Sequence, residues 1–318
     1  MRGDIDRFLS AIESERRFSY NTVIAYRNDL GQFVAFLERE HGEGEAPWDG
    51  TSPRLLRSWR DLTDSCLHAY LQSLHDRRYA ASTVARKTAA LRSFFQFLSQ
   101  EGVLGDDPST RVIPPKVDTF LPRSISPSEM ARLLQQPCQC NGERSNRPES
   151  LRDRAMLETL YATGMRVTEL VSLDLGDVDQ AEIRVRCGTD SARERRVPLG
   201  ETARGAIENY LANGRPHHCP RDGDALFLNR RGKRLTRQGF WLILKSYAEQ
   251  ANIADVTPRT LRHTFATQAI RQGVELRHVQ HLLGHVSIST TQVYRRLANA
   301  PQVIDEEPAT DLATQSRS

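Results

Sequence analysis

Arginines that could hold an anion occur at two places in the second half of the chain. Gly164 ends one helix and lets another begin at once, so Arg166 falls in the first turn of the new helix. Free backbone N–H groups and the helix dipole attract anions there, and Glu169, three residues on, can orient the guanidinium. An Arg–Glu pair taken alone is more typical of a surface salt bridge.

The second place is the segment from Thr257 to Thr267. Thr257 before Pro258 predicts a helix start, which puts Arg259 and Arg262 on one helical face. Two stacked cations repel each other unless an anion lies between them. A solvated basic face is the alternative. We interpret the adjacent His263 as a packed or hydrogen-bonded core residue rather than a catalytic one.

A third segment, residues 282–294, ends in a tyrosine. Gly284 ends a helix and His285 follows it directly. Ser289 and Gln292 predict a capping box for a new short helix that carries Tyr294. Taken alone, this tyrosine would be interpreted as an ordinary half-buried side chain.

Two sets of His, Cys and Glu residues could hold a metal ion. The first set consists of Cys138, Cys140, His217, His218 and Cys219. Its spacing matches no standard zinc motif, and two polar loops are the simpler interpretation. The second set, on one predicted helical face, consists of Glu275, His278, His281 and His285. It would suit a metal-dependent hydrolase, but Gly284 breaks the helix before the last histidine.

The composition is that of a globular chain with two medium-sized cores. Its 318 residues are 38% hydrophobic and 26% charged, with a formal net charge of +4. This modest excess fits a polyanionic partner only if the basic residues are clustered. No stretch resembles a signal peptide or a membrane span, and the five cysteines are an odd number, so we expect reduced thiols in the cytoplasm and no membrane.

Helical periodicity predicts a small helical domain over residues 1–108. The apolar positions recur at helical spacing after Asp4, after a predicted cap at Asn21 and after Ser82. A proline-containing linker follows over residues 109–123. Residues 124–300 form a second domain, in which alternation around Val185 and Val197 predicts two strands and Leu226–Leu228 is a third candidate. The last residues, 301–318, are expected to form an extended acidic tail.

Together, these segments resemble the tyrosine site-specific recombinases of the phage-integrase family, most closely those of the Xer type. Residues 161–170 resemble the first arginine box, residues 262–267 the second, and residues 283–294 the box that ends in the nucleophile. The resemblance covers nearly the whole chain. It implies a mainly α fold: an N-terminal four-helix SAM-like core-binding domain and a mixed α+β catalytic domain with a small antiparallel sheet, closing as a clamp around duplex DNA.

The resemblance also implies a chemistry without metal or cofactor. Tyr294 would attack a DNA phosphate to form a 3′-phosphotyrosyl bond and release a 5′-hydroxyl, and reversal on a partner strand would complete the recombination. Arg166 and Arg262 would bind the non-bridging oxygens. His285 would hydrogen-bond the phosphate, with Glu169 in a supporting position.

Two positions depart from the family pattern. Arg259 stands where a histidine usually precedes the second arginine by three residues; it can stabilise charge but cannot act as a base. The family's hairpin lysine, a general acid, is replaced by Asp190, or by Thr189 if the turn is one residue longer. Each proton-transfer contribution is worth roughly a hundred- to ten-thousand-fold in rate.

The resemblance implies double-stranded DNA as the partner, bound by four subunits on two sites, with or without a second recombinase. An accessory subunit that cleaves poorly, binds a half-site and activates a partner is the alternative, favoured by Arg259 and Asp190. Phosphate contacts would make binding steeply salt-dependent. The candidate DNA-contacting residues are Arg86, Lys87, Arg92, Lys233, Arg234 and Arg237.

Overall fold

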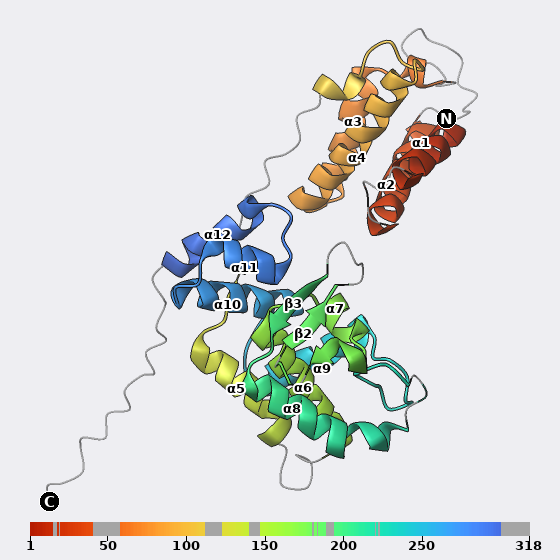
Figure 1. Ribbon diagram of the computed structural model, residues 1–318. Coiled ribbons are helices and arrows are strands. Elements are labelled where there is room, and N and C mark those ends of the chain that lie inside the picture. The colour runs from red at the N-terminus through yellow and green to blue at the C-terminus, as the bar shows by residue number, and fades with distance from the viewer. Residues whose placement is uncertain are drawn as a thin grey trace, which may run out of the picture. The chain divides into compact units, whose positions relative to one another are not determined.

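A computed structural model describes residues 1–14, 18, 20–40, 58–111, 123–139, 147–179, 181–182, 184–188, 194–219, 221 and 223–299. The chain divides into two compact units, Met1–Thr119 and Phe120–Ser318 (Figure 1). Within the described ranges, no helix is both long and apolar enough to cross a lipid bilayer. The predicted acidic tail, residues 112–122 of the predicted linker, and Asp190 lie outside these ranges.

The first unit is helical, as expected from its periodicity. Its helices are α1 (Arg2–Ser14), α2 (Tyr20–Glu40), α3 (Asp64–Asp76) and α4 (Ala81–Gln100). Phe33, Phe94 and Trp59 meet edge-on or stacked in its core, where aromatic side chains contribute a large apolar area. Helix α2 begins at Tyr20, so Asn21 lies inside the first turn and is not the cap that the sequence predicts.

The prediction that Lys87 contacts DNA is corrected by the structure. Its side chain is buried, and its ammonium group bonds to Asp29, at 2.8 Å, and to Gln32. An ammonium group that is buried and held between these two acceptors is not available to a DNA phosphate. Arg86 also pairs with Asp29 but is partly exposed, and Arg92 is half-buried.

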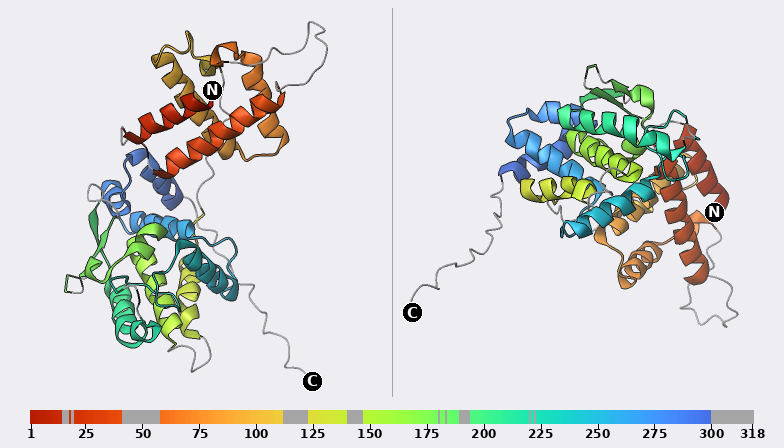
Figure 2. Two further views of the ribbon diagram at one scale, coloured as in Figure 1. Left: turned by 90° about the vertical axis from the view of Figure 1, so that its right-hand side faces the viewer. Right: turned by 90° about the horizontal axis from the view of Figure 1, so that it is seen from below.

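The second unit is built around one buried helix. Helix α6 (Pro148–Thr163) is buried on nearly every face, although it carries the charged residues Arg152, Asp153 and Glu158. It packs against α5 (Pro127–Gln139), α8 (Glu201–Asn213) and α10 (Pro258–Arg271). Helix α9 (Arg237–Gln250) packs against α5 and against α7 (Val167–Ser172). Figures 1 and 2 show α11 (Leu276–Leu283) and α12 (Ile288–Asn299) beside α10 at one end of this unit.

A small antiparallel sheet lies beside these helices, with strand order β1-β2-β3. Its strands are β1 (Val178–Asp179), β2 (Arg184–Cys187) and β3 (Arg195–Pro198), and Val185 pairs with Val197. The third strand is therefore β1, not Leu226–Leu228. That segment is buried but forms only isolated bridges at its ends, Asp174 with Ala225 and Leu228 with Arg234.

Candidate active site

The C-terminal end of α11 organises the candidate site. Gly284 adopts a left-handed conformation with φ +62°. The backbone N–H of Gly284 donates to the oxygen of His281, and that of His285 to the oxygen of Gln280, at 3.0 and 3.1 Å. This pattern is a Schellman motif, which turns the chain sharply and leaves the last carbonyls of the helix free for other donors.

Three arginines from different elements donate hydrogen bonds to carbonyl oxygens at this helix end. Arg195 Nε donates to the Leu282 oxygen at 2.6 Å. Arg262 Nη2 donates to the Leu283 oxygen at 2.6 Å, and Arg166 Nη2 to the Gly284 oxygen at 3.0 Å. The negative end of the helix dipole favours cations at this position. One helix terminus thereby fixes the guanidinium groups of three distant segments next to one another.

Arg262 is buried, and its Nη1 also donates to the oxygen of Gly164 at 2.7 Å. Burial, with the neighbouring charge of Arg166, lowers its pKa to about 10, so it stays protonated at neutral pH. The guanidinium carries five N–H donors, and each of these bonds uses one of them. The guanidinium is therefore a buried, oriented cation with donors to spare, which is what an anion site needs.

Glu169 is the carboxylate that holds this cluster of cations together. Its two oxygens accept from Arg195 Nη1 and Nη2 at 2.8 and 3.0 Å, and one of them also accepts from the backbone N–H of Arg166 at 2.7 Å. Burial raises the pKa of Glu169, but the bonds from Arg195 and Arg166 outweigh it and hold the pKa below its usual range. The predicted Arg166–Glu169 contact is present at 3.3 Å, with Arg166 as the N-cap of α7.

His285 and Tyr294 lie face to face beyond this turn, with their rings nearly parallel and 6.2 Å apart. His285 Nδ1 is 2.9 Å from the hydroxyl of the buried Thr291, which leaves Nε2 for another partner. Tyr294 is buried on α12, and desolvation raises the pKa of its phenol although Arg262 and Arg259 oppose the rise. Helix α12 begins at Ile288, so Ser289 is inside it rather than at its cap.

His263 is a site residue that the sequence interpretation missed. It is packed and hydrogen-bonded, as predicted, but its partner is Tyr294: Nδ1 lies 2.8 Å from the phenol oxygen. Its other nitrogen, Nε2, accepts from Arg259 Nε at 3.0 Å. Arg259 therefore reaches the site through His263. The signal available in the sequence is the spacing of four between Arg259 and His263 on one helix.

Both imidazoles are neutral at physiological pH. Burial, followed by the charges of nearby arginines, lowers the pKa of His263 and of His285 from 6.5 to about 4. Unfolding raises both pKa values again, so between about pH 6.5 and pH 4 the unfolded chain binds more protons than the folded one. The folding stability of unit 2 must therefore fall as the pH falls through this range.

We expect the free energy of unfolding to drop between about pH 7.5 and about pH 5, with a smaller drop in His263→Phe because one proton-linked group is removed. Urea titrations of the full chain at these pH values measure it. His278→Gln, which alters an exposed histidine, controls for losing a histidine as such. An equal pH dependence in His263→Phe and the unaltered protein would contradict the assignment.

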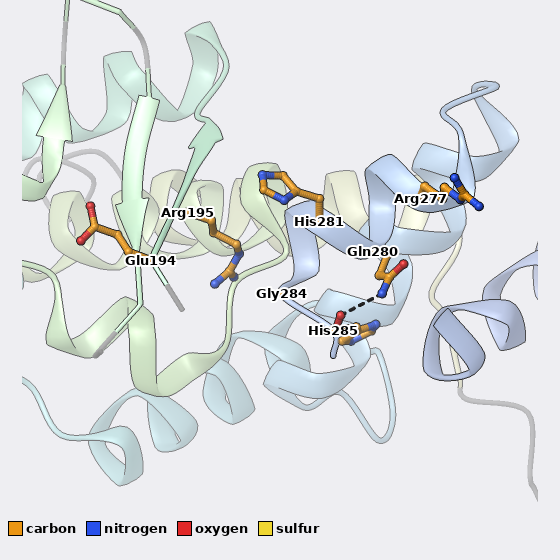
Figure 3. Close-up of a pocket in the computed structure, with 7 residues that line it drawn as sticks. All are labelled: Glu194, Arg195, Arg277, Gln280, His281, Gly284 and His285. Atoms are coloured by element: carbon orange, nitrogen blue, oxygen red, sulfur yellow. Dashed lines mark hydrogen bonds between the residues drawn. The ribbon is translucent and has the colours of Figure 1, made fainter. Parts of the chain in front are cut away.

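A cavity of about 470 Å³ opens onto the arginines and is lined by Arg166, Arg195, Gly284 and His285. A neighbouring hollow of about 340 Å³ shares three of these residues and adds Glu194, Arg277, Gln280 and His281 (Figure 3). Figure 3 shows Arg195 extending from β3 toward Gly284. A Cβ at Gly284 would lie 3.1 Å from Arg195 Nη1, so any larger residue there would have to displace this guanidinium by a few tenths of an ångström.

The other predicted residues lie apart from this turn. Lys233 and Arg237 are exposed. Arg234 pairs with Asp174 and donates to the oxygens of Val171 and Leu173, at 3.2 and 3.0 Å, and so holds α7. Its side chain is partly exposed, and its contact with DNA stays a prediction. Asp190 lies outside the described residues.

In the part of the chain that the structure describes, no three His, Cys, Asp or Glu side chains converge as either alternative metal set would require. For the second set the reason is the turn at Gly284, which directs His285 to Thr291 and away from the face of α11. Cys140 of the first set lies outside the described residues.

Comparison with known proteins matches both units. Residues 123–300 match the model of the phage integrase family, and residues 5–102 match the phage integrase N-terminal SAM-like domain. The chain is 47% identical over 301 residues to "Tyrosine recombinase XerC" of Herpetosiphon aurantiacus, covering 94% of this chain and 92% of that protein. It is 40% identical to "Tyrosine recombinase XerD" of Halalkalibacterium halodurans, covering 92% and 93%.

Solved structures share the fold at low identity. A lambda integrase fragment bound as a dimer to a COC′ core site superimposes with a TM-score of 0.66 at 17% identity, over 96% of this chain and 99% of that one. The XerH recombinase bound to its difH substrate gives a TM-score of 0.67 at 18% identity, over 92% and 81%. The expected mainly α fold, with a SAM-like unit and a small antiparallel sheet, is confirmed.

Proposed function

Because the chain belongs to the phage integrase family and is a tyrosine recombinase closest to the Xer type, we propose that the turn at the end of α11 is where it cuts and rejoins DNA strands during site-specific recombination. Tyr294 is the nucleophile, and its oxygen bonds to the phosphorus as the bond to the 5′ oxygen breaks. The exchange of one phosphoester for another needs no external energy source, since the phosphotyrosyl bond is used to rejoin the strand.

The arginines supply the electrostatic part of the chemistry. Arg262 and Arg166 bind the non-bridging oxygens of the phosphate, because their guanidinium groups are already held by adjacent carbonyls and need no reorganisation. His285 donates a hydrogen bond from Nε2, its Nδ1 being occupied by Thr291. Glu169 positions Arg166 and neutralises the excess charge of the buried cluster.

The observation that carries this proposal is the convergence of four residues from three separate segments around one helix end. Arg262 donates to the carbonyl of Leu283 and Arg166 to that of Gly284. His285 is the next residue in the chain, and Tyr294 stacks on it. Such a set is what phosphoryl transfer without metal requires: bound charge, an oriented donor and a nucleophile.

Covalent trapping on nicked suicide DNA duplexes tests the proposal, using candidate sites from the neighbourhood of the gene. The unaltered protein is expected to form an adduct that survives a denaturing gel and is insensitive to chelator. Tyr294→Phe is expected to bind the same DNA and form none. An adduct in Tyr294→Phe, or one lost on adding chelator, would show that the nucleophile or the reaction class is wrong.

The accessory-subunit alternative is favoured by the absence of lysine between Gly188 and Val197, where Asp190 stands, and by Arg259 at the family's usual histidine position. It predicts DNA binding with little adduct in the unaltered protein and an increased yield in Asp190→Lys. A similar yield in both proteins supports the active enzyme.

We further propose double-stranded DNA as the partner, bound by subunits that pair across two sites in the cytoplasm. Lys233 and Arg237 are exposed and contact DNA phosphates away from the turn at Gly284. The DNA-bound dimer of the lambda integrase structure supports a multimeric arrangement.

A further inference from the structure

The role of His263 rests on the proposed function of Tyr294 as the nucleophile. His263 lies between two groups of different character. An arginine side chain carries only donors, so the 3.0 Å bond from Arg259 Nε requires a lone pair on His263 Nε2. A neutral imidazole with a lone pair on Nε2 carries its hydrogen on Nδ1. Arg259 therefore selects the tautomer of His263.

The selected tautomer decides the direction of the bond to the nucleophile. Nδ1 lies 2.8 Å from the phenol oxygen of Tyr294. With its hydrogen on Nδ1, His263 donates and Tyr294 accepts. The ring is buried, and its pKa of about 4 keeps it neutral, so it is not converted to the doubly protonated form at physiological pH. A neutral ring whose Nε2 is occupied and whose Nδ1 is protonated has no lone pair for the phenol proton.

We propose that His263 is a catalytic hydrogen-bond donor to the oxygen of Tyr294, not its general base, and that Arg259 is the positioning residue that fixes this orientation. The donor stabilises negative charge on the phenol oxygen. That charge develops when the tyrosine attacks, and again when the same oxygen leaves during rejoining. Hydrogen bonds to charged oxygens are stronger than those to neutral ones, so the contribution is greatest in the two transition states.

The atoms balance without a proton on His263. In cleavage the bond from the phenol oxygen to phosphorus forms, the bond from phosphorus to the 5′ oxygen breaks, the phenol proton passes to water, and the 5′ oxygen takes up one proton. Rejoining reverses each step. Arg259 occupies the family's usual histidine position but cannot exchange protons. Acting through His263, it does not need to.

Paired substitutions separate a donor from a base. His263→Asn places an amide N–H near the position of Nδ1 but cannot act as a base, whereas His263→Phe keeps a ring and removes the donor. Groups that face His263 are Arg259 and Arg262 on its own helix, Tyr294 on α12, and His285 beyond α11. These stay unchanged in both variants, so differences in pH dependence report on position 263.

We expect His263→Phe to form the covalent adduct about 10- to 100-fold more slowly than the unaltered protein near neutral pH, which is the usual strength of a hydrogen bond to a charged group. The deficit should shrink as the pH approaches that at which tyrosine ionises unaided. His263→Asn should recover most of the rate, and all three proteins should bind DNA equally. Equal slowness of Asn and Phe, or a constant deficit at every pH, would overturn the donor role.

A second measurement needs no cleavage. Nitrogen NMR of the histidine rings in the free full-length protein distinguishes the two tautomers. We expect hydrogen on Nδ1 of His263 in the unaltered protein and a mixture in Arg259→Met. Hydrogen on Nε2 in the unaltered protein would overturn the inference even if trapping succeeds. If the unaltered protein forms no adduct while the Nδ1 tautomer is seen, the proposed recombination chemistry has failed and the arrangement of His263 stands.

Discussion

Replacing Arg262 with glutamine is expected to abolish nearly all strand cleavage while leaving the protein folded. The guanidinium is buried and fixed by the carbonyls of Gly164 and Leu283, so it meets the phosphate without reorganising. Removing one preorganised donor of this kind costs about 100- to 1000-fold, and removing an arginine's charge in phosphoryl transfer costs up to about 10⁵-fold. We therefore expect a loss of at least about 1000-fold in the initial rate of adduct formation on suicide duplexes.

The same substitution should have little effect on stability, because two effects oppose each other. Arg262 is penalised by burial and by the charge of Arg166, which together lower its pKa, so a neutral side chain relieves both. Glutamine, however, satisfies fewer of the carbonyls that Arg262 binds. We expect a melting temperature within about 3 °C of the unaltered protein.

Arg271→Gln is the matched control, since Arg271 lies at the other end of α10, is exposed and also donates to two carbonyls, those of Leu297 and Ala298. It should cleave at nearly the normal rate. A loss of less than tenfold in Arg262→Gln, or an equal loss in both variants, would mean that Arg262 does not bind the reacting phosphate.

Helix caps and helix ends depend on residues that are neighbours in the chain, so the sequence predicts the elements that carry the site. Gly164 and Gly284 end their helices in left-handed conformations, at φ 58° and 62°, and Thr257 caps α10 through its hydroxyl. These signals place the residues on elements but do not say which elements touch.

The contacts between elements could not be predicted in this way. Three arginines share the end of α11 because β3, α7 and α10 converge there, which no spacing reveals. The same limit explains Lys87: its helical position gives an amphipathic face, but whether that face meets solvent or Asp29 depends on how α2 packs.

The burial of Arg195 could also have been predicted from the sequence. Residues two apart on a strand share a face, so the inward position of Val197 predicts that Arg195 is also inward. Both are buried. A buried arginine requires a counter-charge, and Glu169 is such a residue in the first arginine box. The carboxylate of Glu169 pairs with Arg195 at 2.8 Å and with Arg166 at 3.3 Å, so one acidic residue serves both arginines.

Replacing Glu169 with glutamine should have the largest effect on stability. Glu169 is 7% exposed and receives both Nη atoms of the buried Arg195. Breaking a buried pair by neutralising one partner typically costs about 3–5 kcal/mol, since the other charge stays buried. Here the loss also leaves Arg166, Arg195 and Arg262 without their shared carboxylate. Urea unfolding measures the free energy, and Glu201→Gln, at an exposed Arg204 pair, is the control, with an expected change below about 1 kcal/mol.

The pH dependence of the free energy of unfolding tells whether Glu169→Gln destabilises the protein by removing a charge or by altering the packing. The pKa of Glu169 is held below its ordinary value of 4.5 in the folded protein, so its contribution is present above that pH and disappears as the pH falls through the folded value. The difference in stability between the unaltered protein and Glu169→Gln should therefore narrow in acid. A difference that stays constant from neutral to acid pH would mean that packing of the amide, not the missing charge, destabilises the variant. If charge is responsible, Arg195→Met in the Glu169→Gln background should recover part of the lost free energy, because it removes the unpaired buried cation that the first substitution leaves behind.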